Sequence, residues 1–160
     1  MKKDIKISSW EDIKQKRSIR NVLMDLLKKI EGRAYPSIYQ SFTSFTQWSD
    51  FEDYCETSRI IVLWDDNKDW YLLLGISGRS LEVIDLASLR GLSHINMEEL
   101  LKKFFLILKD HNIEKILMDM RETTSYKFIK IFDNNIWKII KDQSYDWEGE
   151  IFHDIIIRKR

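Results

Sequence analysis

The sequence predicts an α/β (α+β) protein built on a mixed, mostly antiparallel sheet of about seven strands, with one central parallel pair and helices on both faces. Three observations predict this class. Apolar runs at 59–64, 70–77 and 80–88 follow one another closely, a long amphipathic segment occupies 97–111, and two further runs surround a Glu-Gly turn near the end. Short turns join antiparallel strands, whereas a helix-length connection normally joins parallel ones.

The first third of the chain predicts one strand and two helices. Charged and apolar residues alternate over 3–8, which indicates a strand. Ser8 and Glu11 have the spacing of a capping box, and apolar residues near helical spacing then predict a helix running to about Glu31. Aromatic residues spaced along 48–55 predict a short second helix.

The remaining elements fix part of the topology. Asn96 is a good N-cap for the helix 97–111, which leads into a strand at 113–121. We therefore expect strands 80–88 and 113–121 to be parallel neighbours. A short helix capped by Thr123 or Thr124 and two strands, 136–147 and 150–160, complete a single domain spanning residues 1–160.

Composition excludes several classes of protein. With 26 basic and 26 acidic residues the formal charge is zero, so we expect no nucleic-acid and no membrane partner. Apolar residues make up 44%, enough to build a core, which excludes a disordered chain. The single cysteine, Cys55, excludes an intramolecular disulfide and any zinc site with two thiolates. No apolar run has the length of a membrane span or of a secretory signal, so we expect a cytoplasmic protein.

Charge is distributed unevenly along the chain. Residues 1–33 hold 10 basic and 5 acidic residues, and many of the basic ones fall on the predicted first helix. The simpler interpretation is a solvated helix face. The alternative is a binding face for an acidic partner.

The order of elements and three local stretches resemble the GNAT superfamily of acyl-CoA-dependent N-acyltransferases over the whole chain. KKIEGRAYPS (28–37) is similar to the end of that family's first helix, and LEVIDLAS (81–88) to its fourth strand. ILMDMRETTSYKFIKIFDNNIW (116–137) resembles its fifth strand and following helix. The resemblance implies acetyl-CoA, or another acyl-CoA, as co-substrate, and an amine of a small molecule or a protein as acceptor.

The resemblance also implies a coenzyme site. The backbone of Leu86, Ala87 and Ser88 would hold the pantetheine arm, and Thr124 matches the family's asparagine. The family's glycine-rich pyrophosphate turn is matched only by SLRGLSHINMEE (88–99), which has no second glycine. The candidates left for this role are Arg90, Gly91, His94 and Asn96.

A second departure concerns the tyrosine that protonates the leaving thiolate in the family. Its best match is Phe132, and a phenyl ring donates no proton. Tyr126 is the candidate substitute, because a phenol can donate. Its alternative role is packing in the core beside the threonines that cap the helix.

Acidic residues on the central strands are candidates for the general base. Glu82 lies about where some family members hold a base, although a solvated strand glutamate is the simpler interpretation. Asp85 interrupts the apolar run VIDLA, and Asp119 interrupts the neighbouring LMDMR in the same way. A buried carboxylate needs donors or a cation, so these two could also be structural acids satisfied by loop N–H groups or by Arg121.

Other candidates are weaker. His94, His111 and His153 are too far apart in sequence to suggest a metal site, and we expect none. Glu31 and Tyr35 would line the acceptor side if the resemblance holds.

Two functions remain open: an N-acetyltransferase, and a GNAT-like binding or accessory protein that has lost the chemistry. The sequence indicates neither the acceptor, nor the acyl group, nor the oligomeric state.

Overall fold

The computed structural model describes residues 4–18, 20–21, 59–65, 70–88, 95–132, 134–147 and 149–160. The short helix expected at 48–55 and the end of the first helix near Glu31 lie outside these residues. Everything below concerns the described part of the chain.

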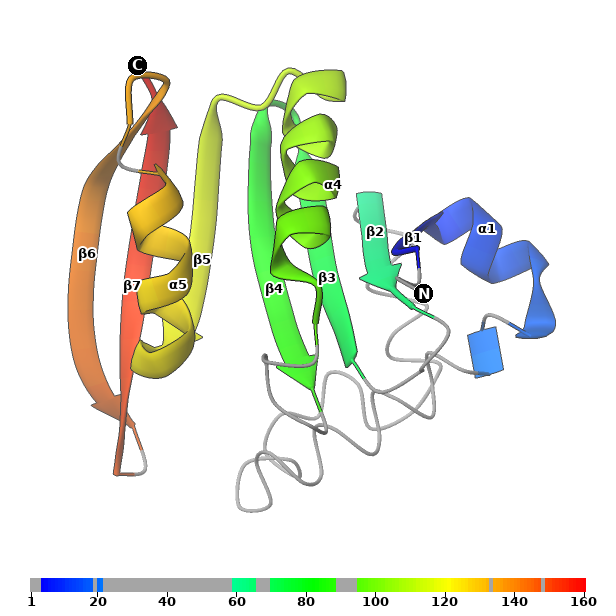
Figure 1. The fold of residues 1–160 in the computed structure, drawn as a ribbon, viewed down its shortest axis with the longest axis horizontal. Coiled ribbons are helices and arrows are strands. Elements are labelled where there is room, and N and C mark those ends of the chain that lie inside the picture. The colour runs from blue at the N-terminus through cyan, green and yellow to red at the C-terminus, as the bar shows by residue number, and fades with distance from the viewer. Residues whose placement is uncertain are drawn as a thin grey trace.

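A seven-stranded sheet organises the structure (Figure 1), in the order β1-β2-β3-β4-β5-β7-β6. All neighbours are antiparallel except β4 and β5, which are parallel. The predicted class and the predicted parallel pair are therefore confirmed. The strands are β1 Lys6–Ser9, β2 Arg59–Trp64, β3 Trp70–Ser77, β4 Ser80–Ser88, β5 Lys115–Arg121, β6 Trp137–Trp147 and β7 Glu150–Lys159.

Tight turns account for two of the antiparallel pairs. Gly78 and Arg79 alone connect β3 to β4, and Gly78 has φ 58°, a conformation that glycine adopts at little cost. Gly149, with φ 81°, plays the same part between β6 and β7, at the Glu-Gly turn that the sequence predicts.

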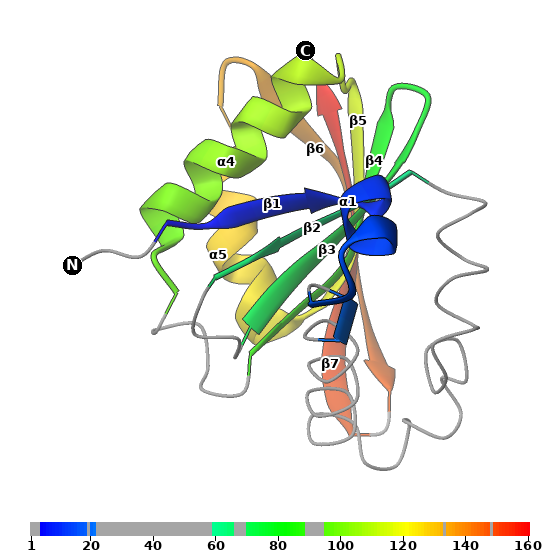
Figure 2. The ribbon, with the colours of Figure 1, turned by 90° about the vertical axis from the view of Figure 1, so that its right-hand side faces the viewer.

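Helices α4 (Met97–Asp110) and α5 (Glu122–Phe132) lie on the same face of the sheet (Figure 2). The core between α4 and the sheet includes Leu100, Phe104 and Phe132, together with alternate residues of the strands. The short helix α1 (Trp10–Gln15) packs against β1 and β2. No helix among the described residues is long and apolar enough to span a membrane.

Both faces of the central strands are buried, which explains their continuous apolar runs. In β2, Ile61 and Leu63 belong to the core under the helices, whereas Ile60 and Val62 are buried outside that cluster. A strand covered on both faces loses the alternation of apolar and polar residues.

The structure corrects three details of the prediction. The N-cap of α1 is Ser9, paired with Asp12 in a capping box, rather than Ser8 with Glu11. The predicted first helix is interrupted after Gln15, because Lys16 is extended with φ −104° and ψ 99°, and residues 17, 18, 20 and 21 are helical again. The five residues 14–18 contain no apolar side chain, so no buried stripe holds a straight helix there. α5 begins at Glu122, directly after β5, before either threonine expected to cap it.

Candidate active site

The parallel strands β4 and β5 separate before either strand ends. Their pairing runs from Ser80 with Lys115 to Val83 with Met118 and then stops. β4 continues to Ser88 and β5 to Arg121, and the two ribbons diverge toward these ends (Figure 1). Every second peptide of a strand points toward one neighbour. Residues 85–88 pair with β3 on one side, so the backbone N–H and C=O groups of this segment that point the other way face the opening, where β5 no longer pairs with them.

A β-bulge lies where the strands separate. On β3, Leu73 pairs with Asp85 and Leu74 pairs with Val83, so Ile84 is the extra residue of β4. Bulges bend a strand and redirect its peptide groups, and they are common beside active sites. Gly75 makes room for this one, because a Cβ on Gly75 would lie 3.1 Å from Cδ1 of Ile84.

The N-terminus of α4 lies at the open end of the sheet (Figure 1). Its N-cap Asn96 accepts a hydrogen bond from the N–H of Glu99 through Oδ1, at 3.3 Å, as the sequence predicts. A helix N-terminus attracts anions, but this first turn carries the carboxylates of Glu98 and Glu99. Lys102 and Lys103 lie 3.6 and 3.9 Å from those carboxylates and offset part of their charge.

The predicted residues of β4 fall on both sides of the point of separation. Glu82 is exposed and lies in the paired segment, opposite Leu117 of β5. Asp85, Leu86, Ala87 and Ser88 lie beyond the last pair with β5, in the segment whose backbone faces the opening.

The predicted residues of α5 lie on the other side of the opening. The backbone of Thr124 belongs to the first turn of α5. Tyr126 is exposed, and its ring centre is 6.1 Å from that of His153 on β7. Since β5 lies between β7 and β4, this contact directs Tyr126 away from β4.

Phe132 is fully buried. Its ring contacts Phe104, Phe105 and Trp137, with ring centres 5.4–6.1 Å apart. The side chain that matches the family's tyrosine is thus part of the core between α4, α5 and the sheet.

Five predicted residues lie outside the described residues: Arg90, Gly91, His94, Glu31 and Tyr35.

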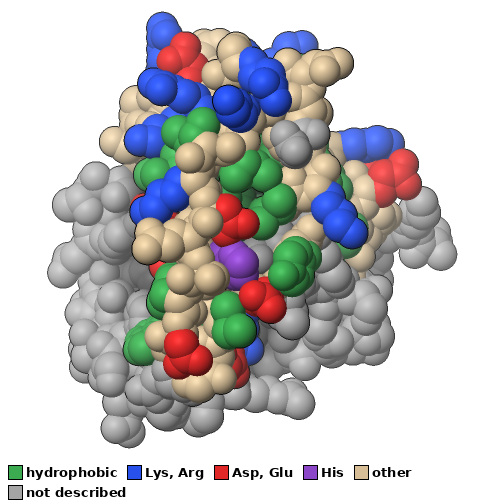
Figure 3. Space-filling view, turned by 90° about the vertical axis from the view of Figure 1, so that its left-hand side faces the viewer, with side chains coloured by type: hydrophobic (Ala, Val, Ile, Leu, Met, Phe, Trp, Pro, Cys, Tyr) green, Lys and Arg blue, Asp and Glu red, His purple; other side chains and the backbone are tan. Residues whose placement is uncertain are grey.

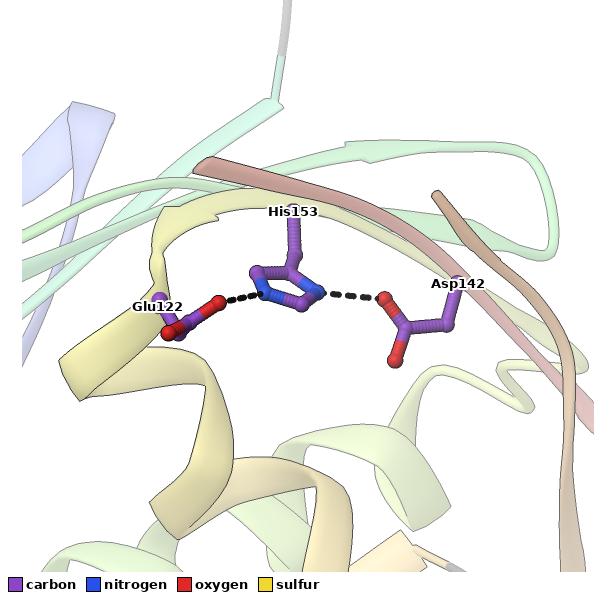
Figure 4. Close-up of polar contacts among 3 residues, drawn as sticks. All are labelled: Glu122, Asp142 and His153. Atoms are coloured by element: carbon purple, nitrogen blue, oxygen red, sulfur yellow. Dashed lines mark hydrogen bonds and ion pairs between the residues drawn. The ribbon is translucent and has the colours of Figure 1, made fainter. Parts of the chain in front are cut away.

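The structure brings together three charged residues that the sequence analysis did not connect (Figure 4). His153 Nδ1 is 2.6 Å from Oδ1 of Asp142 on β6, and its Nε2 is 2.9 Å from Oε2 of Glu122 at the start of α5. We call Glu122, Asp142 and His153 the His153 clamp. On this side of the molecule a histidine lies in a hollow between acidic side chains, with apolar side chains around it (Figure 3).

The two carboxylates of the His153 clamp favour the protonated form of His153. His153 is only 8% exposed, yet hydrogen bonds to Glu122 and Asp142 raise the pKa of His153 above its ordinary value, against the opposing effect of burial. The one signal in the sequence is a histidine at a buried position of the apolar strand EIFHDIIIRK, since a buried polar group needs partners.

A second polar contact lies on the opposite face of the sheet. Asp119 is exposed and directly follows Met118, the last β5 residue paired with β4. The Tyr145 hydroxyl donates to Oδ1 of Asp119 at 2.6 Å, and the Tyr145 ring stacks on Phe152. Among the described residues no three His, Cys, Asp or Glu side chains are grouped as a metal site would require.

Comparisons with known proteins give the fold. No protein-family model and no curated protein sequence matches the chain. Among solved structures, the aminoglycoside 6′-N-acetyltransferase from Enterococcus faecium is similar, with a TM-score of 0.60, 11% identity and 96% of each chain covered. A GNAT family acetyltransferase from Elizabethkingia anophelis with acetyl-CoA bound has a TM-score of 0.54 at 12% identity, over 99% of this chain and 98% of that one.

A third structure is the PaiA N-acetyltransferase from Thermoplasma acidophilum in complex with coenzyme A. It has a TM-score of 0.53 and 16% identity, over 98% of this chain and 99% of that one. These likenesses extend from end to end, so the chain has the fold of the GNAT superfamily.

Proposed function

We propose that this chain, which has the GNAT fold, is an acyl-CoA-dependent N-acyltransferase that transfers an acetyl group to an amine. One observation carries the proposal: β4 and β5 separate after Val83 and Met118, beside a bulge at Ile84. This separation exposes peptide groups that can bind an extended ligand as another strand would. The fold's neighbours include structures with acetyl-CoA and coenzyme A bound, which supports a coenzyme as that ligand.

The reaction is the attack of a neutral amine nitrogen on the thioester carbonyl carbon. A carbon–nitrogen bond forms, the carbon–sulfur bond breaks, and the electron pair of that bond leaves with the coenzyme sulfur. The nitrogen gives up a proton to a base, and the thiolate gains one from an acid or from water. Backbone groups of Leu86, Ala87 and Ser88 bind the pantetheine and polarise the thioester carbonyl.

Glu82 and Asp85 are the candidates for the base. Glu82 is exposed and able to exchange protons with solvent. Asp85 directly follows the bulged residue Ile84, and a bulge bends its strand, as is common beside active sites. Positioned proton transfer of this kind contributes typically about 10²–10⁴-fold to a rate.

The coenzyme phosphates would bind at the N-terminus of α4. Arg90, Gly91, His94 and Asn96 precede that helix, and Thr124 belongs to the first turn of α5 across the gap. With Phe132 buried in the core, Tyr126 remains the candidate acid, and its side chain would have to turn from His153 toward the opening to donate. Water can replace it, because a thiolate leaves without full protonation.

The acceptor is an amine of a small molecule or a protein, and Glu31 and Tyr35 are the candidates to line its approach. Similar structures include enzymes named for an aminoglycoside and for the alanine of ribosomal protein S18, which illustrates both kinds of acceptor. We place this activity in the cytoplasm, in a single domain.

Thermal unfolding with and without coenzyme A tests the proposal. Ligand at about 100 times its dissociation constant adds about 2.7 kcal/mol to the free energy of unfolding. For a chain of this length we expect a rise in Tm of about 5–10 °C. Thiol release from acetyl-CoA with a panel of amines then measures turnover. Glu82→Gln and Asp85→Asn should reduce turnover without changing the shift in Tm if either is the base. An unchanged Tm at millimolar coenzyme A would refute the proposal.

A further inference from the structure

We propose that His153 is a positioning residue: with Glu122 and Asp142 it holds the first turn of α5 at the free end of β5, and it keeps the charge of Glu122 away from the coenzyme phosphates. The first half stands on the geometry of the His153 clamp alone. The second half rests on the proposed function.

The contacts of the His153 clamp require a doubly protonated ring. Each ring nitrogen lies within hydrogen-bond distance of a carboxylate oxygen, at 2.6 Å for Nδ1 and 2.9 Å for Nε2. An ionised carboxylate only accepts hydrogen bonds, so both nitrogens must carry a proton. A neutral imidazole has one N–H, and one of the two contacts would then bring two lone pairs together.

The groups around His153 come from three elements. α5 contributes Glu122 and Tyr126, and β6 contributes Asp142. Opposite His153 on β5 lies Met120, which does not titrate, and opposite it on β6 lies Ser144. The protonated ring thus contacts two carboxylates from two different elements.

Loss of the proton should break the contact with Glu122 rather than the contact with Asp142. The contact with Glu122 is the longer one, at 2.9 Å against 2.6 Å, whereas the two carboxylate side chains are equally exposed, at 35% and 36%. Glu122 is the first residue of α5 and directly follows Arg121, the last residue of the part of β5 that pairs with β7 but not with β4. A released carboxylate there is attracted to the positive N-terminus of its own helix. It would then repel a polyanionic coenzyme bound in the adjacent opening.

Coenzyme A binding should therefore depend on pH in a definite direction. Coenzyme A binds best while His153 is protonated, and binding weakens as pH rises and the ring loses its proton. Removing the charge of Glu122 should abolish this weakening. A role for His153 in folding alone would not give such a rescue.

Calorimetric titration of coenzyme A into four proteins tests the inference at about pH 6, below the ordinary histidine pKa of about 6.5, and at about pH 9, well above it. The proteins are the wild type, His153→Gln, Glu122→Gln and, as a matched control, His111→Gln at the end of α4. The Kd for coenzyme A at the higher pH, divided by the Kd at the lower pH, gives a factor for each protein. That factor should be about ten times larger for the wild type and His111→Gln than for His153→Gln and Glu122→Gln. The coenzyme's own phosphates titrate identically in all four, so the differences between proteins are decisive.

The double variant His153→Gln/Glu122→Gln should bind coenzyme A as tightly at high pH as Glu122→Gln does, whereas His153→Gln alone should bind about tenfold more weakly. Equal pH dependence in the wild type and in Glu122→Gln would overturn the inference, and that comparison remains valid if His153→Gln fails to fold.

Amide hydrogen exchange separates failure of the inference from failure of the proposed function. Protection of the amides of residues 122–126 should fall at high pH in the wild type, after correction for the intrinsic exchange rate, and should be low in His153→Gln at both pH values. If coenzyme A binds at no pH, the proposed function fails, and exchange still decides whether His153 holds α5. Unchanged protection in His153→Gln would show that it does not.

Discussion

At the scale of single residues, a buried histidine between two carboxylates makes stability depend on pH. The hydrogen bonds that the His153 ring donates to Glu122 and Asp142 raise the pKa of His153 in the folded protein above its ordinary value of about 6.5. The folded state therefore binds more protons than the unfolded state in the interval between the two pKa values. The stabilisation is complete below the ordinary pKa and is lost as pH rises through the raised one.

We predict that the difference in Tm between the wild type and His153→Gln is largest on the acid side of neutrality and shrinks as pH rises above about 6.5. Thermal unfolding followed by circular dichroism over a pH series measures it. His111→Gln, at the end of α4, serves as the matched histidine control. A difference that grows with pH would contradict the assignment of the protonated ring.

The burial of Phe132 decides what a tyrosine would do at its position. We predict that Phe132→Tyr lowers the free energy of unfolding by about 1–3 kcal/mol, because the added hydroxyl enters a core of aromatic rings. Urea denaturation measures this loss. Tyr126→Phe, at an exposed position, should change stability by less than about 0.5 kcal/mol. We expect no faster thiol release in Phe132→Tyr, and a gain would show that position 132 reaches the reacting atoms.

At the scale of elements, the acidic side chains in the first turn of α4 stabilise the helix but disfavour the phosphate binding proposed for its N-terminus. Glu98 and Glu99 suit a helix N-terminus by themselves, because a carboxylate interacts favourably with the helix dipole. The same charges oppose a phosphate at that end.

We predict that Glu98→Gln/Glu99→Gln tightens coenzyme A binding several-fold at low salt, with a smaller gain at high salt where charges are screened. The replacement should also cost a few tenths of a kcal/mol of stability, since two favourable dipole interactions are lost. Glu114→Gln is the matched control, because Glu114 pairs with Arg79 beside the turn that joins β3 to β4. Equal gains at low and high salt would exclude an electrostatic cause.

At the scale of the whole molecule, the pair β4–β5 joins two antiparallel parts of one sheet. β1 to β4 form one part, and β5, β7 and β6 form the other. Leu81 of β4 pairs with Ile116 of β5, and both are fully buried in the core under α4. The two parts should therefore unfold together.

We predict that Leu81→Ala lowers the free energy of unfolding by about 2–5 kcal/mol in a single cooperative transition. Tryptophan fluorescence and far-UV circular dichroism should report the same midpoint in denaturant. Leu106→Ala, at a residue 48% exposed on α4, should cost much less. Two separate transitions would mean that the parts fold independently.

Sequence patterns alone determined most elements of the sheet, because these depend on local signals. Three apolar runs with short turns, a long crossover helix and a final hairpin predict the parallel pair, but they do not predict that β7 rather than β6 lies beside β5. The patterns were less accurate at helix ends. Ser8 and Ser9 are both good caps, and local spacing could not show that the Ser8 hydroxyl instead accepts a hydrogen bond from Nε1 of Trp64 at 2.9 Å.

Only the tertiary structure decided which side chains meet. The β4–β5 opening depends on where pairing stops and on one bulged residue, Ile84, and neither leaves a pattern in the sequence. The His153 clamp joins residues 11 and 31 positions apart, from β6 and from the start of α5. Periodicity predicts which face of an element is buried, but contacts between elements depend on strand register and helix placement, which non-local packing determines.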